Sequence, residues 1–217
     1  PATLLGTNKV SSVFGTLFAA FRYAKVAKIS WNAVLPAAVM ALPGALAGAY
    51  LVTQLPVQTL RLALPVMLFV IALYTYFKKD LGLVHAPRLS IRGERIAGGL
   101  LGFSIGFYDG LFGPGTGSFL MVGFVALFGF NFLTATAGAK VVNVICNLSS
   151  LVWFVPSGHV LLTVGVAMAV FNVLGAFVGS ALAIARGSGF IRRVLLLLVA
   201  VLIVKTSYDV YWPLLVS

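Results

Sequence analysis

Long apolar runs separated by short polar stretches dominate the chain. The runs cover residues 4–22, 30–53, 58–77, 135–155, 160–184 and 194–213. As helices, most of them are long enough to cross a hydrocarbon core of about 30 Å, and they lack the alternation typical of membrane β-strands. The pattern therefore predicts an all-α polytopic membrane protein.

One further apolar stretch, residues 96–130, differs from the others because glycine and proline interrupt it. The interrupting residues are Gly106, Gly110, Gly113, Pro114, Gly115 and Gly117. They forbid one continuous helix, and irregular backbone at membrane depth is tolerated only where protein buries it or where it lines a wet cavity. We expect a re-entrant or short helical hairpin with its tip among other helices. A hairpin that is merely bent, without a ligand, is the alternative.

Composition and charge agree with a membrane protein. Hydrophobic residues make up 61% of the chain and charged residues 9%, which excludes an ordinary soluble domain. The net charge of +11 is concentrated in residues 22–28, 78–95 and 186–193, and such basic loops face the cytoplasm. The loops at 54–57 and 156–159 lack Lys and Arg and should face outward. The basic charge thus predicts topology and no nucleic-acid partner.

The two halves of the chain align when one is shifted by 131 positions. Lys9 then falls on Lys140, and the Gly44-Ala45 and Gly48 positions fall on Gly175-Ala176 and Gly179. Glycines four residues apart also favour close helix packing. Because the two lysine-bearing spans begin on opposite sides of the membrane, the shift predicts two inverted-topology repeats, which are typical of secondary transporters.

The repeat suggests a domain organisation. We expect an incomplete first repeat of three spans at residues 1–80, a basic cytoplasmic linker at 81–95, and a second repeat at 96–217 that holds the hairpin and three spans. The counterpart of the hairpin would fall before residue 1, so we expect the native protein to have another Gly-rich hairpin upstream.

Charged residues inside the spans are the candidates for function. Asp109 lies deep in the broken stretch, and an intramembrane ionisable residue is a functional-site hypothesis by default. Lys9 and Lys140 have polar neighbours, although snorkelling of both lysines to a span end is an alternative. Asn143 and Asn147 share a helical face with Lys140. Three roles are open for Asp109. It is protonated, it is paired with Lys140, or it couples protons or gates transport together with Tyr108.

The broken stretch adds backbone groups to this candidate site. Thr116, Gly117 and Ser118 should begin the return helix, whose first N–H groups lack partners and attract anions. Lysines, amides and a helix N-terminus together predict an anion site. Its expected members are Thr7, Asn8, Lys9, Gly113, Gly115, Thr116, Gly117, Ser118, Lys140, Asn143 and Asn147.

Residue types for catalysis or metal binding do not form a recognisable set. Cys146 has no histidine near it in sequence, and His85 and His159 show no metal-ligand spacing. We therefore expect no catalytic residue, no metal and no cofactor, and a protein that is not an enzyme.

Two motifs resemble the TauE/SafE family of membrane permeases, also called sulfite exporters. Residues 106–118 carry the signature Gly-x-x-Asp-Gly-x-x-Gly-Pro-Gly-Thr-Gly-Ser, and residues 139–147 carry Ala-Lys-x-x-Asn-x-x-x-Asn. Gly6-Thr7-Asn8-Lys9 looks like the matching element of the first half. The resemblance extends over nearly the whole chain, which lacks the usual Gly-rich first hairpin of the family.

This resemblance implies a secondary transporter that exports sulfite, sulfonates or other organosulfur anions. We expect it to work by alternating access, and proton coupling stays open. It also implies an integral protein of a bacterial or archaeal plasma (inner) membrane. The expected partners are the small anionic substrate and the lipid bilayer, and a homo-oligomer stays open. The alternatives are a non-transporting assembly or interaction subunit and an anion channel.

Overall fold

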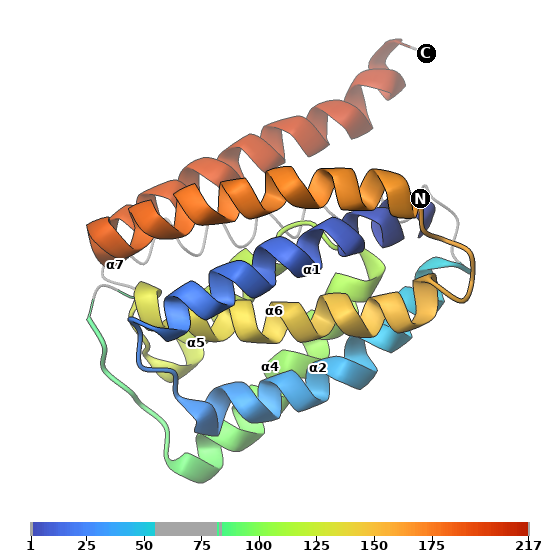
Figure 1. The fold of residues 1–217 in the computed structure, drawn as a ribbon. Coiled ribbons are helices and arrows are strands. Elements are labelled where there is room, and N and C mark those ends of the chain that lie inside the picture. The colour runs from blue at the N-terminus through green and yellow to red at the C-terminus, as the bar shows by residue number, and fades with distance from the viewer. Residues whose placement is uncertain (1, 55–81, 83, 217) are drawn as a thin grey trace.

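The computed structural model describes residues 2–54, 82 and 84–216, and all regular secondary structure in these residues is helical. The helices are α1 (Ala2–Ala24), α2 (Trp31–Val52), α4 (Ile91–Leu111), α5 (Thr116–Phe128), α6 (Phe132–Phe154) and α7 (Leu162–Val216), shown in Figure 1. The predicted all-α class is therefore confirmed. The predicted span 58–77 lies outside the described residues.

Three helices in the described part of the chain are long and apolar enough to cross a membrane. They comprise Trp31–Val52, Phe132–Phe154 and Leu162–Val201, and Thr116–Phe128 is a shorter apolar helix. Together with the apolar surfaces that these helices expose, this supports an integral membrane protein.

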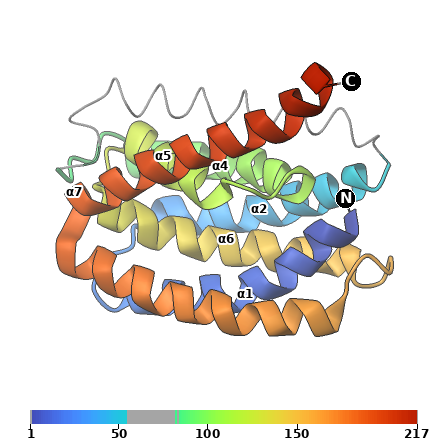
Figure 2. The ribbon, with the colours of Figure 1, turned by 90° about the horizontal axis from the view of Figure 1, so that it is seen from above.

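Helix α6 lies at the centre of the bundle and contacts α1, α2, α4, α5 and α7 (Figures 1 and 2). Its start follows from local sequence, because the side chain of Asn131 accepts a hydrogen bond from the Thr134 amide at 2.8 Å and so caps the helix. The rings of Phe124 and Phe128 of α5 and of Phe132 at the start of α6 are fully buried in the core. The start of α6 is thereby anchored inside the protein.

Helix α7 consists of two arms that meet at Gly187, where φ is 69° and ψ is −166° (Figure 2). The first arm packs against α1, since the Asn172 amide donates to Ser11 Oγ at 3.3 Å and the Arg22 guanidinium donates to the Phe177 carbonyl at 2.8 Å. We predicted a basic loop at residues 186–193, but the helix resumes directly after Gly187. A positive φ at glycine allows this tight reversal without a loop.

Helices α2 and α4 pack more closely than any other pair in the described structure. Gly98, Gly102, Gly106 and Gly110 recur every fourth residue along α4 and lie against the alanine-rich face of α2. Gly44 of α2 contacts the backbone of α4 in return, which agrees with the close packing predicted from its spacing. This interface fixes α4, and with it the position of Asp109.

The interface predicts that substitution by alanine affects stability differently at two glycines of α4, Gly99 and Gly102. A Cβ on Gly102 would overlap the Ala37 carbonyl oxygen and lie 2.6 Å from Ala37 Cα, whereas a Cβ on Gly99 would meet only Met40 Cγ at 3.4 Å. Gly102→Ala should therefore destabilise the protein by about 1–3 kcal/mol, while Gly99→Ala should be neutral or stabilising. Thermal unfolding of the purified proteins in detergent measures both. Equal melting temperatures for the two variants would contradict this packing.

Candidate functional site

The glycine-rich stretch breaks the polypeptide between α4 and α5, as the sequence predicts. Helix α4 ends at Leu111 and α5 begins at Thr116, with Gly113 at φ 83° and Gly115 at φ 86° between them. Residues with a side chain rarely adopt these angles, so glycine is required at both positions. The Tyr108 hydroxyl donates to the Pro114 carbonyl at 2.6 Å and so ties the connection back to α4.

The N-terminus of α5 presents open backbone amides. Gly115, which precedes the helix, has no side chain to cap it, and the amides of the first turn have no intrahelical acceptor. Gly117 is especially open, because an added Cβ would meet nothing within 4 Å. A helix end of this kind favours negative charge.

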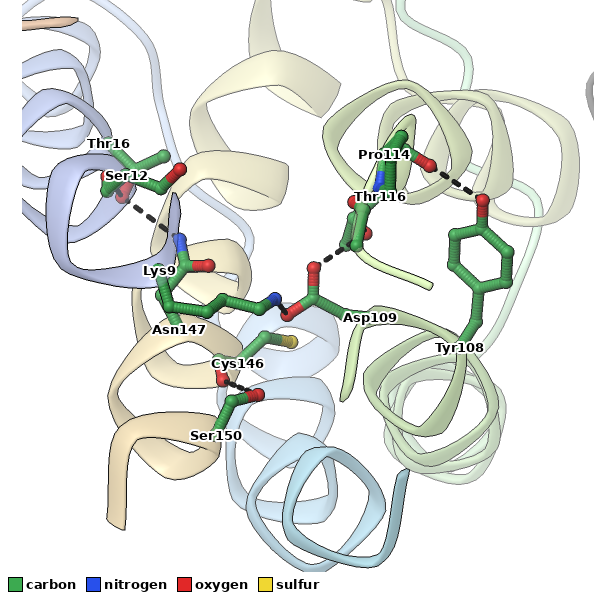
Figure 3. A network of polar contacts seen from close by, with 11 residues as sticks. Lys9, Ser12, Thr16, Tyr108, Asp109, Pro114, Thr116, Cys146, Asn147 and Ser150 are labelled. Carbon is green, nitrogen blue, oxygen red and sulfur yellow. Dashed lines mark hydrogen bonds and ion pairs between the residues drawn. The ribbon is translucent and has the colours of Figure 1, made fainter. Parts of the chain in front are cut away.

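Asp109 joins three helices at this break. Its side chain is almost completely buried, and its Oδ2 atom forms an ion pair with Lys9 Nζ of α1 (Figure 3). Its Oδ1 atom accepts a hydrogen bond from Thr116 Oγ1 of α5 at 2.6 Å. That hydroxyl also lies 2.8 Å from the Gly113 carbonyl oxygen. The alternative of an Asp109–Lys140 pair is wrong in this structure, because the partner is Lys9.

Lys9 does not snorkel to the end of its helix. Only 2% of its surface is exposed, and its ammonium group points inward to Asp109 (Figure 3). A buried ion pair needs both members, because removal of one leaves an uncompensated charge. Lys9 and Asp109 therefore fix α1 against the broken hairpin.

A cavity of about 620 Å³ opens beside this ion pair. Ten of the eleven predicted binding residues line it. They are Asn8, Lys9, Gly113, Gly115, Thr116, Gly117, Ser118, Lys140, Asn143 and Asn147. Asp109 lines the cavity as well.

Two predicted residues lie elsewhere. The Thr7 hydroxyl donates to the Thr3 carbonyl at 2.7 Å and accepts from the Leu161 amide at 3.0 Å, so Thr7 holds the connection before α7. Tyr108 does not line the cavity, because its ring packs against those of Phe112 and Phe119. Both residues hold segments next to the cavity in place: Thr7 binds the connection before α7, and Tyr108 binds the connection between α4 and α5.

Lys140 and Lys9 have different surroundings although they match in the repeat. Lys140 lines the cavity without a hydrogen-bond or ion-pair partner among the described residues. Asn143 and Asn147 line the cavity on the same helix, and the Asn147 amide donates to Thr16 Oγ1 of α1 at 3.4 Å. The free ammonium group, the amides and the α5 N-terminus together form a surface suited to an oxyanion.

The cavity includes residues that the sequence reasoning missed. They are Ser12, Tyr23, Met121, Thr136, Gly179, Leu182, Ala183, Phe190, Ile191, Val194, Leu195 and Leu198. The 131-residue shift contains a signal for one of them, because it places Ser12 on Asn143. The shift also matches Gly179 of α7 with Gly48, but that match indicates helix packing and no ligand, and the other α7 residues have the pattern of an ordinary apolar span.

Comparison with known proteins agrees with this architecture. The family described as "Sulfite exporter TauE/SafE" matches residues 1–206. A probable membrane transporter protein, ORF9, from Sinorhizobium sp is 38% identical over 218 residues, which cover 99% of this chain and 81% of the relative. YfcA of Escherichia coli strain K12, also named a probable membrane transporter protein, is 35% identical over 96% of this chain and 77% of its own length.

A probable membrane transporter protein from Haemophilus influenzae is 32% identical over 98% of this chain and 82% of its own length. No solved structure gives a significant match. The family match covers nearly the whole chain and includes both motifs that line the cavity. The chain therefore belongs to the TauE/SafE family and is a membrane transporter of that type, not an enzyme.

Proposed function

We propose that this protein is a secondary transporter that exports small sulfur oxyanions, such as sulfite or organic sulfonates, by alternating access. The observation that carries the proposal is the convergence of the partner-free Lys140, Asn143, Asn147 and the open N-terminus of α5 on one cavity. The family description as a sulfite exporter supports an oxyanion with sulfur as the class of cargo.

Charge and hydrogen bonding favour an anion in this cavity. The ammonium group of Lys140 supplies charge, the side-chain amides supply N–H donors, and the helix end supplies backbone donors and a positive dipole. A tetrahedral or pyramidal oxyanion has acceptors in several directions and can accept from all three sources at once. A cation would be repelled by the ammonium group of Lys140 and by the positive end of the α5 dipole, both of which face the cavity.

Asp109 is proposed to gate the site. Its two carboxylate oxygens connect Lys9 of α1 to Thr116 of α5, so one charge holds the two parts of the chain together. Protonation of Asp109 would remove its attraction to Lys9 and weaken the link between α1 and the hairpin. One part of the molecule would then be free to rock against the other, as alternating access requires.

The first prediction of this proposal concerns binding. The purified protein, titrated with sulfite, thiosulfate, taurine and sulfoacetate, should show a saturable increase in thermal stability with at least one anion, of about 2.7 kcal/mol at a hundredfold excess over Kd. Lys140→Ala should weaken that binding at least about tenfold, because a charge-assisted hydrogen bond contributes about 1.5–3 kcal/mol.

Lys25→Ala is the matched control. Lys25 is an exposed lysine that lies over the Phe21 ring and away from the cavity, so its loss should leave the shift intact. Wild-type affinity in Lys140→Ala would contradict the site. No shift with any anion would favour a non-transporting subunit instead, and unsaturable conductance in bilayers would favour a channel.

The second prediction concerns coupling. Asp109→Asn should retain anion binding but reduce pH-gradient-driven accumulation in proteoliposomes at least about tenfold, because an asparagine amide cannot carry the proton that a carboxylate can. Thr116→Ser keeps the hydroxyl that donates to Asp109 and should remain coupled.

Loss of Asp109 leaves Lys9 buried without its partner, which is expected to destabilise the fold by about 3–5 kcal/mol. The double variant Lys9→Met, Asp109→Asn removes both charges and should recover part of that stability. Proton-driven accumulation by either variant at the wild-type rate would show that Asp109 has no role in coupling.

A further inference from the structure

The cavity is much larger than a bare inorganic oxyanion. Its volume of about 620 Å³ lies within the range of pockets that hold drug-sized molecules, about 300–1,000 Å³. Sulfite, a single sulfur with its oxygens, would contact only a small part of the walls. The size of the cavity therefore favours an anion that carries an organic body.

The polarity of the cavity walls follows the helices from which they come. The polar groups come mainly from α1, from residues 113–118 and from α6, whereas α7 contributes only apolar residues, among them Leu182, Phe190 and Leu195. A ligand inside therefore meets charge and hydrogen-bond donors on one side and hydrocarbon on another. This arrangement suits a molecule with a polar head and an apolar tail.

The charges of the cavity favour a ligand with a single negative charge. Among the described lining residues, Lys9, Asp109 and Lys140 are charged, and Lys9 and Asp109 are paired with each other. When Lys140 is protonated, one unpaired positive charge remains in the cavity. A second negative charge on the ligand would be desolvated without a counter-charge, which is unfavourable inside a protein.

We infer that the preferred ligand is an organic monoanion whose single sulfonate-like head lies against Lys140 and the α5 N-terminus while its apolar tail lies against α7. This inference rests on the proposed function because it uses the same cavity. It narrows the substrate from organosulfur anions in general to amphipathic ones with one charge.

A chain-length series tests the tail. The purified protein is titrated with methanesulfonate, butanesulfonate and hexanesulfonate, and affinity is measured by calorimetry and by thermal shift. Affinity should increase about fourfold for each added methylene that becomes buried. Hexyltrimethylammonium has the same tail with a positive head and should not bind. Equal affinities for the three sulfonates would overturn the assignment of the tail to the apolar wall.

Two neighbouring leucines of α7 localise the tail. Leu198 lines the cavity and is 46% exposed, whereas Leu197 does not line it and is 69% exposed, so alanine at either position leaves no cavity in the protein core. Leu198→Ala should reduce the gain from methanesulfonate to hexanesulfonate at least threefold, and Leu197→Ala should leave it unchanged. Equal effects of the two variants would contradict a tail site on α7.

The valence is tested with sulfate and methanesulfonate, which have similar heads and different charge. The wild-type protein should bind methanesulfonate at least tenfold more tightly than sulfate. Asp109→Asn releases the charge of Lys9 and should reduce that preference. Tighter binding of sulfate than of methanesulfonate by the wild-type protein would overturn the inference of a monoanion.

These outcomes separate the inference from the proposed function. If no anion of any length or valence binds, the proposed anion site itself fails. If sulfite binds saturably and loses affinity in Lys140→Ala while the sulfonate series is flat, the proposed function stands and the amphipathic ligand is wrong.

Discussion

The buried ion pair between Lys9 and Asp109 is the constraint on which the arrangement of the site depends. Each charge would be strongly unfavourable alone in this interior, so each requires the other. Lys9 is on α1 and Asp109 is at the end of α4, and their contact forces two segments that are far apart in sequence to meet. Thr116 extends the link to α5 through the second carboxylate oxygen. The cavity lies where these three helices meet α6 and α7.

Close packing of α2 and α4 gives the ion pair a rigid support. The glycines of α4 bring its backbone against Ala37 and its neighbours on α2, so α4 cannot shift sideways without overlap. Asp109 follows directly from this packed segment, and Gly110 beside it is part of the same interface. The non-helical connection in the site is therefore short, and it consists of residues 112–115 between two packed helices.

The sequence predicted those features of the site that depend on the backbone preferences of neighbouring residues. The helix break at Gly113 and Gly115 and the start of α5 at Thr116 follow from backbone preferences that any single sequence displays. The partner of Asp109 did not follow, because Lys9 and Lys140 are equivalent in the sequence repeat and only tertiary packing distinguishes them. The apolar side of the cavity was likewise not predictable, because a lipid-facing leucine and a cavity-facing leucine on α7 have the same pattern in a sequence.

Under the proposed function, the different surroundings of two matching lysines account for the preference of the cavity for anions. If both were paired with carboxylates, the site would have no net charge, and if both were free, it would carry two positive charges at a high cost of desolvation. The four acidic residues of the chain include one that lines the cavity, Asp109, and it neutralises Lys9. The same charge that holds the helices together thus leaves Lys140 as the group that can attract a ligand. In this proposal, Lys9 holds the helices together and Lys140 binds the ligand, although the 131-residue shift matches the two lysines with each other.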